Sequence, residues 1–143
     1  MTVKTILAAK GGEVITIDPT ATIAAAANLL SERRIGALLV LGPDHCVAGI
    51  LSERDIVRAL AKQGPSALDE SVSQVMTRKV VTCNPTDTIG DIMEQMTAGK
   101  FRHVPVLEQG RLVGIISVGD VVKQRLGEME RESAAMREYI ATA

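Results

Sequence analysis

An internal duplication constrains this chain more than any other feature. Residues 14–23 recur as residues 80–89, at an offset of 66, with Val, Thr, Pro, Thr, Thr and Ile identical in both segments. Residues 49–57 recur as residues 114–122 at an offset of 65, so the first copy carries one additional residue. That residue falls in the turn-rich segment 42–45, where a hairpin tip tolerates a change of length. The sequence therefore predicts two tandem copies of one supersecondary unit.

Each copy has the residue pattern of a β-α-β-β-α unit. A β-branched run, residues 14–17 and 80–83, ends at Asp-Pro or Asn-Pro, a pair that stops a strand and precedes a helix. One helical face then carries apolar residues in both copies: Ile23, Ala26, Ala27 and Leu30, and Ile89, Ile92, Met93 and Met96. Two apolar strands around a turn follow, 37–41 with 47–51 and 104–107 with 112–116, and a second helix begins near Glu53 and near Val118. Because a unit of roughly 55–60 residues is small for a core of its own, we predict an α/β fold whose two copies pack with approximate twofold symmetry.

The two copies set the predicted domain boundaries. Repeat 1 takes residues 1–62 and repeat 2 takes residues 72–126, with a linker at 63–71 that holds a Gly-Pro break. A C-terminal helix takes residues 127–143. Its apolar stripe has one gap near Ser133 and consists of Val122, Leu126, Met129, Met136 and Ile140. Such a stripe either covers its own domain or binds a partner, and because it is longer than one small module needs, we expect a homodimer.

Composition excludes several classes of protein. The 143 residues include 16 basic and 17 acidic side chains, one Phe, one Tyr and no Trp, so no basic or stacking surface for nucleic acid is expected. No apolar run approaches the 18 or so residues of a membrane span, and the first residues lack a signal-peptide core. Cys46 and Cys83 are expected to be reduced thiols that pack as small apolar groups. We therefore predict a soluble, cytoplasmic protein with no nucleic-acid or membrane partner.

Catalytic equipment is sparse. His45 and His103 have no Cys or carboxylate at metal-ligand spacing, and the carboxylates form no recognisable acid–base pair. The sequence has no nucleophile elbow and no glycine-rich phosphate loop. We predict no enzymatic activity, no catalytic residue and no metal site.

A polar pair recurs where the last strand of each copy meets the following helix. Ser52 stands three residues before Asp55, and Ser117 stands three residues before Asp120. Such a pair can be a plain helix cap. It also suits a nucleotide, because a carboxylate accepts hydrogen bonds from two ribose hydroxyls and a helix N-terminus favours a phosphate. The residues alone leave both interpretations open.

These motifs resemble a known family. The pattern Gly-h-h-Ser-x-x-Asp, where h is apolar, ends at Asp55 and again at Asp120, and residues 101–106 read Phe-Arg-His-Val-Pro-Val. From about residue 3 to residue 126 the sequence resembles a pair of cystathionine-β-synthase (CBS) domains. The resemblance implies a stand-alone, non-catalytic regulatory module that binds AMP, ADP, ATP, NAD or S-adenosylmethionine in clefts between the repeats, and that acts through its own shape, its dimer or an unidentified protein partner. The alternative is a structural interaction module with vestigial clefts.

The resemblance also implies how residues divide between two clefts. The first cleft would combine Ser117 and Asp120 with Thr16, Ile17, Ile35, Gly36 and Ala37. The second would combine Ser52 and Asp55 with Thr82, Cys83, Phe101, Arg102 and His103. The family places phosphate-binding basic residues at positions that this chain fills with Arg54 and Gly119, and with Gly36 and Arg102. We expect both arginines to converge on the Asp120 cleft, which should bind a phosphorylated adenosine more tightly than the Asp55 cleft.

Overall fold

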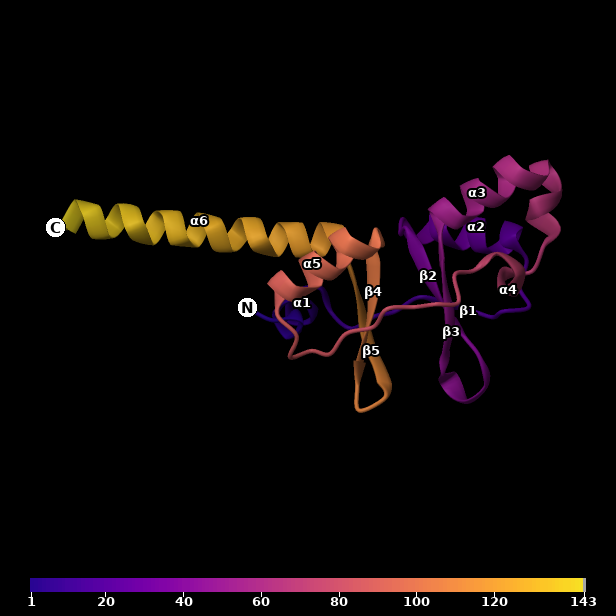
Figure 1. The fold of residues 1–143 in the computed structure, drawn as a ribbon, viewed down its shortest axis with the longest axis horizontal. Helices are drawn as coiled ribbons and strands as arrows, with labels where there is room; N and C mark the ends of the chain where they lie inside the picture. The colour runs from indigo at the N-terminus through magenta and orange to yellow at the C-terminus, as the bar shows by residue number, and fades with distance from the viewer. Residues whose placement is uncertain (143) are drawn as a thin grey trace. The chain divides into compact units, whose positions relative to one another are not determined.

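The chain forms two compact units, and their division does not follow the order of the sequence. The computed structural model describes residues 1–142, apart from the side chain of Asp44. Residues 13–81 make the first-copy unit, whereas residues 1–12 join the residues from 82 onward in the second-copy unit (Figure 1). The N-terminal segment therefore belongs in space with the second copy.

The first-copy unit has the predicted β-α-β-β-α order. It contains β1 (Thr16–Ile17), α2 (Ile23–Arg33), β2 (Ala37–Leu41), the 3₁₀ turn η1 (Pro43–His45), β3 (Val47–Ser52), α3 (Glu53–Gln63), the 3₁₀ segment η2 (Gly64–Asp69) and α4 (Val72–Val75). The sheet has the order β1-β2-β3, in which β1 and β2 are parallel and β2 and β3 antiparallel. The predicted helical face is buried at Ile23, Ala26 and Leu30, which pack on Leu38, Val40 and Leu51. This confirms the predicted unit.

The second-copy unit repeats the plan with a shorter first strand. It contains α1 (Val3–Lys10), α5 (Ile89–Gly99), β4 (His103–Glu108), β5 (Arg111–Ser117) and α6 (Val118–Thr142). In place of the strand predicted at 80–83 there is one parallel bridge between Cys83 and Val106. The Cys83 N–H donates to the Pro105 carbonyl at 3.0 Å, and the Leu107 N–H donates to the Cys83 carbonyl at 2.8 Å. Two backbone hydrogen bonds to β4 thus stand in the place of the predicted strand.

Local details recur at the offset found in the sequence. The side chains of Thr22 and Thr88 accept from the N–H groups of Ala25 and Asp91, each at 3.1 Å, and so cap α2 and α5. Each helix is followed by a residue with left-handed backbone, Arg34 after α2 and Lys100 after α5. The two hairpins also carry a register shift at the same place, after Val40 and after Val106. The duplication extends to capping and strand register.

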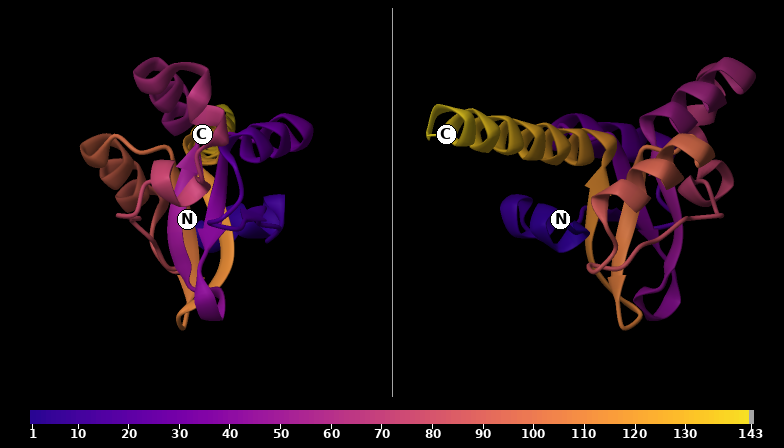
Figure 2. Two further views of the ribbon diagram at one scale, coloured as in Figure 1. Left: turned by 90° about the vertical axis from the view of Figure 1, so that its right-hand side faces the viewer. Right: turned by 60° about the vertical axis from the view of Figure 1, so that its left-hand side comes forward.

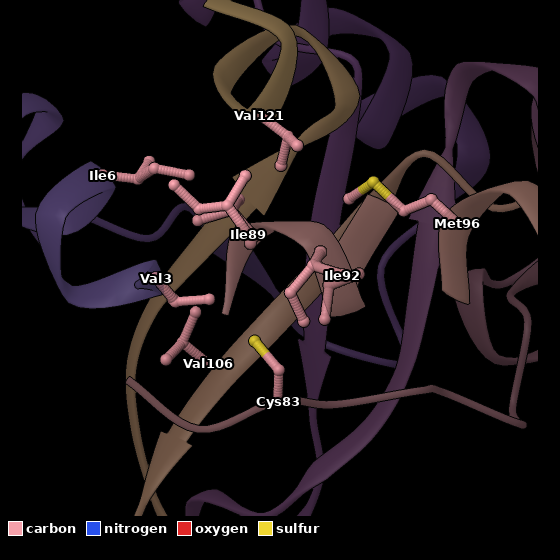
Figure 3. Close-up of a cluster of buried hydrophobic side chains, with 10 residues drawn as sticks. Val3, Ile6, Cys83, Ile89, Ile92, Met96, Val106 and Val121 are labelled. Atoms are coloured by element: carbon pink, nitrogen blue, oxygen red, sulfur yellow. The ribbon is translucent and has the colours of Figure 1, made fainter. Parts of the chain in front are cut away.

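The segment that precedes each copy completes the other copy. The Val3 N–H donates to the Asp87 carbonyl at 2.9 Å, and the Val72 N–H donates to the Ala21 carbonyl at 2.8 Å. Val3 and Val72 are both 0% exposed, and each lies in the core of the unit on which it docks. Figure 3 shows Val3 and Ile6 of α1 directed at side chains of the second copy. Each unit therefore combines one copy with the segment that precedes the other.

The predicted linker is an ordered part of the first-copy unit. α3 ends at Gln63, and the next residue, Gly64, has a φ of 75° that is favourable for glycine. The segment continues as η2, in which Ala67 is 0% exposed and Leu68 packs against the core. Residues 63–71 thus fold back onto their own unit.

The predicted C-terminal helix is the second half of α6. This helix begins at Val118, as expected, and runs without a break to Thr142; the last residue of the predicted range 127–143 lies outside the described part of the chain. The stripe residues Val122, Leu126, Met129, Met136 and Ile140 are all exposed. The stripe does not cover its own domain.

The substitution Val3→Ala tests whether the N-terminal segment stabilises the second-copy unit on which it docks. We expect the free energy of unfolding to fall by about 2 kcal/mol, because the substitution leaves a cavity in the second-copy core. Urea unfolding measures the change. Val57→Ala is the matched control, since Val57 is 64% exposed on α3 and should change stability by less than about 0.5 kcal/mol. Equal effects of the two substitutions would contradict a structural role for the docked segment.

Candidate functional site

The first Ser-Asp pair forms a complete capping box at the start of α3. The Asp55 N–H donates to Ser52 Oγ at 3.2 Å, and the Ser52 N–H donates to Asp55 Oδ2 at 3.0 Å. The Ser52 hydroxyl also donates to Asp55 Oδ2 at 3.1 Å. Thr77, which follows α4, donates from its hydroxyl to Asp55 Oδ1 at 3.2 Å. Both carboxylate oxygens of Asp55 therefore have hydroxyl partners within its own unit.

The second Ser-Asp pair has the same box and a different neighbour. The Asp120 N–H donates to Ser117 Oγ at 3.1 Å, and the Ser117 N–H donates to Asp120 Oδ2 at 2.9 Å. Lys10, the last residue of α1, donates from Nζ to the same Oδ2 at 2.7 Å and to the Ile115 carbonyl at 2.9 Å. Among the described residues, no hydrogen bond reaches Asp120 Oδ1. The second pair thus joins an ammonium group and leaves one acceptor oxygen available.

The surroundings of Asp120 keep its carboxyl ionised. Partial burial by itself would raise the pKa, but the hydrogen bond from Lys10, the bonds from Ser117 and the charge of Lys10 together lower it below the usual 3.8. A carboxyl with a lowered pKa contributes stability above its unfolded-state pKa of about 3.9, and the contribution is lost as the pH falls through the folded-state value. At neutral pH the site therefore presents a carboxylate at a helix N-terminus.

The start of the second strand lies beside the Ser-Asp pair in each unit. The Glu53 N–H donates to the Gly36 carbonyl at 3.0 Å, and Ala37 is opposite Ser52 in the hairpin. In the second-copy unit the Val118 N–H donates to the Arg102 carbonyl at 2.8 Å, and His103 is opposite Ser117. The hairpin register thus joins, within one unit, two parts of the motif set that are about 15 residues apart in sequence.

The remaining predicted residues divide between the units. The first-copy unit holds Thr16, Ile17, Ile35, Gly36, Ala37, Ser52, Arg54 and Asp55, and the second-copy unit holds Thr82, Cys83, Phe101, Arg102, His103, Ser117, Gly119 and Asp120. Each predicted cleft draws on both sets, so the combination of residues across the two units stays a prediction. Lys10 and Thr77 were missed by sequence reasoning. Neither lies near a recognisable motif, and Lys10 is 110 residues from Asp120.

The two cysteines differ in exposure to solvent. Cys83 is 4% exposed within the second-copy core (Figure 3), and burial, with a smaller contribution from the charge of Asp87, raises the pKa of its thiol to about 12. This thiol is protonated at neutral pH and packs as a small apolar group, as predicted. Cys46 is exposed, so the expectation that it packs in the same way is wrong. A role of Cys83 beside a ligand stays a prediction.

The described residues bear on two further expectations. Among the side chains that the structure describes, no group of three or more His, Cys, Asp and Glu residues is placed to hold a metal ion. None of the helices described is both long enough and apolar enough to cross a membrane. Each unit therefore offers one helix N-terminus that carries a carboxylate, a group that accepts hydrogen bonds from hydroxyls.

Known proteins are similar to this chain in sequence and in fold. The family model of the CBS domain matches residues 4–62 and 72–127. The mitochondrial CBS domain-containing protein CBSX3 of Arabidopsis thaliana is 32% identical over 123 residues, which are 83% of this chain and 60% of the length of that relative. The crystal structure of the CBS-domain protein ATU1752 from Agrobacterium tumefaciens has a TM-score of 0.85 and 51% identity, and the match covers 87% of this chain and 92% of that one. The CBS domain pair of protein MJ0100, solved with 5′-methylthioadenosine and S-adenosyl-L-methionine, has a TM-score of 0.79 and 26% identity over 90% of this chain and 98% of that one.

Lys10→Met tests the electrostatics around Asp120. The substitution keeps the length of the side chain and removes its charge and its hydrogen bonds, so we expect the pKa of Asp120 to rise toward its unfolded-state value. The part of the acid-induced loss of stability that Asp120 contributes should then become smaller. Carboxyl carbon shifts followed by NMR during a pH titration measure the pKa. Lys4→Met is the control, because Lys4 is also an exposed lysine of α1 but makes no ion pair with any described side chain. If both variants leave the Asp120 pKa unchanged, the ion pair does not form in solution.

Proposed function

This chain belongs to the CBS-domain family, and from that premise we propose that it is a non-catalytic regulatory module that binds an adenosine-type ligand. The proposed ligand classes are AMP, ADP, ATP, NAD(H) and S-adenosylmethionine. In this proposal the two repeats pack with approximate twofold symmetry and form two clefts, each with one Ser-Asp motif. The MJ0100 domain pair supports the ligand class, because both molecules bound to it contain adenosine.

The observation that carries the proposal is the ionised carboxylate of Asp120 at the start of α6. Its Oδ2 accepts hydrogen bonds from Lys10 Nζ and the Ser117 N–H, while Oδ1 accepts none from the side chains and backbone that the structure describes. A ribose presents two neighbouring hydroxyl donors, and a carboxylate with free lone pairs accepts both. The helix N-terminus beside it favours the negative charge of a phosphate.

Two arginines support a phosphorylated ligand. Arg54 and Arg102 are exposed, and neither guanidinium makes an ion pair or a hydrogen bond within the described part of the chain. We infer that both face the Asp120 cleft, whereas Gly119 and Gly36 occupy the matching places of the Asp55 cleft. Guanidinium groups bind phosphates by charge-assisted hydrogen bonds, so the Asp120 cleft would take the more highly charged ligand.

A second candidate function is a structural interaction module with vestigial clefts. The observation that favours it is the completeness of both capping boxes, which gives each Ser and each Asp a structural role without any ligand. In that case the module would act only through a protein partner. Ligand binding separates the two functions.

The proposed location is the cytoplasm. Its support is that Cys46 and Cys83 are both free thiols, as expected of a reducing compartment.

A thermal-shift panel of AMP, ADP, ATP, NAD⁺, NADH and S-adenosylmethionine tests the proposed function. A ligand that binds only the native state raises the melting temperature by mass action, in proportion to the logarithm of its concentration above Kd. We expect at least one adenosine compound to raise it, and guanosine phosphates at the same concentration to leave it unchanged. No shift with any adenosine compound at millimolar concentration would leave the structural module as the function.

Isothermal calorimetry on variants tests the division between clefts. We expect Asp120→Asn to weaken the binding of both AMP and adenosine by roughly 1–3 kcal/mol, or about five- to 150-fold, because the ribose loses its charged acceptor. Arg102→Ala should weaken AMP far more than adenosine, since it removes a phosphate partner and no ribose contact.

Asp91→Asn is the matched control for the Asp120 variant. Asp91 occupies the same third position of its helix, α5, but lies outside the Ser-Asp motif, and its substitution should leave binding unchanged. If Asp55→Asn abolishes AMP binding while Asp120→Asn retains it, the assignment of the clefts is wrong.

A further inference from the structure

The C-terminal half of α6 is a helix with no element of its own unit beside it. Val121 is 1% exposed, but every residue from 129 to 142 is exposed. Figures 1 and 2 show α6 continuing well past α1 and α5. An unpacked helical segment of this length is only marginally stable in water. The segment therefore needs a surface that covers it.

Apart from Tyr139, the large exposed apolar side chains of α6 lie on a single seam. The seam positions are Val122, Leu126, Met129, Ser133, Met136 and Ile140, separated by alternate steps of four and three residues. The five apolar members are between 43% and 67% exposed. Alternate steps of three and four are the heptad pattern of a coiled coil, with Leu126, Ser133 and Ile140 at a positions and the other three at d positions. The seam is built to meet a second helix.

We propose that α6 pairs with α6 of a second copy of this chain as a parallel, in-register, two-stranded coiled coil. The charges beside the seam identify this occupant. In a parallel pair, each g position faces the e position five residues later on the other helix. Arg125 then faces Glu130 of the second copy, and Glu132 faces Arg137 of the second copy. Twofold symmetry repeats both pairs, so four ion pairs flank the seam, each between a positive and a negative side chain.

Antiparallel pairing does not reproduce this match along the whole seam. When the seams overlap fully, e faces e and g faces g, so Lys123 meets Arg137 and Glu130 meets its own copy. A shorter antiparallel overlap, centred between residues 127 and 128, would pair Lys123 with Glu130 but would leave Met136 and Ile140 exposed. Only the parallel register both buries the seam and pairs its charges.

Two side chains on α6 are consistent with this register. Ser133 lies in the middle of the seam, and in register the two serine hydroxyls face each other and can form a hydrogen bond. A single polar residue at an a position is a known means of fixing register, because in any other register it lies against apolar groups. Arg125 already pairs with Glu128 of its own helix at 3.1 Å, and its remaining guanidinium donors can reach the second copy.

Disulfide crosslinking tests the orientation. In a Cys46→Ser background, Ser133→Cys should oxidise to a covalent dimer, because the two residues at position 133 face each other. Glu138→Cys is the matched control: Glu138 lies on the outer face of the same helix and should stay monomeric on a denaturing gel. Cys83 can remain, since it is buried. The proposal is overturned if Ser133→Cys crosslinks no faster than Glu138→Cys, or if only Val122→Cys combined with Ser133→Cys crosslinks.

Sedimentation of charge variants tests the pairing. Glu132→Arg places like charges opposite Arg137, and we expect the Kd of the dimer to rise roughly five- to thirtyfold. Combining it with Arg137→Glu should restore the original Kd, which neither antiparallel register predicts. Met129→Glu, at the centre of the seam, should give monomers whose thermal unfolding remains cooperative. A full chain that is monomeric at tens of micromolar, or a Met129→Glu variant that remains dimeric, would overturn the proposal.

Discussion

The docking of each preceding segment on the other copy is the interaction on which both units depend. Val3 and Val72 are wholly buried in cores most of whose members come from the opposite copy. Their N–H groups, which begin α1 and α4, are satisfied by carbonyls of that copy. A copy without this segment would expose a core face and lose these hydrogen bonds. Tandem duplication in one chain supplies both segments at once, which explains why a unit this small is used as a pair.

The same segments reach the candidate sites. Close approach is possible because Gly49 has no side chain: a Cβ there would lie 2.8 Å from the Thr77 carbonyl and 2.6 Å from the Met76 sulfur. The segment after α4 thereby contacts Asp55 through Thr77, and the end of α1 contacts Asp120 through Lys10. One carboxylate meets a neutral hydroxyl and the other an ammonium. The duplicated motif therefore has two electrostatic environments, and the difference arises outside the motif.

Local features of this fold could be predicted from the sequence, but the docking of each preceding segment on the other copy could not. The hairpins, the start of α3 at Glu53 and the start of α6 at Val118 follow from apolar spacing and from the Ser-Asp pairs, which act over three or four residues. The ion pair between Lys10 and Asp120 spans 110 residues and depends on which copy α1 docks against. Spacing along the chain contains no information on that choice, because both copies offer the same apolar face. The strand predicted at residues 80–83 is shortened to one bridge for a related reason. The β-branched residues favour a strand there, but its hydrogen bonds depend on how β4 lies beside it.

The two copies diverge most where their last helices end, and the cause is local. Gly64-Pro65 stops α3 and returns the chain onto its own unit, where Ala67 is buried. At the matching offset of 65, α6 has Met129-Glu130, two residues that favour continuation of a helix. The chain that folds back in the first copy is therefore free in the second copy. A free helix with an apolar seam destabilises a monomer in water and stabilises an assembly that covers it, so the loss of one helix stop converts an intramolecular packing segment into a surface for a second copy.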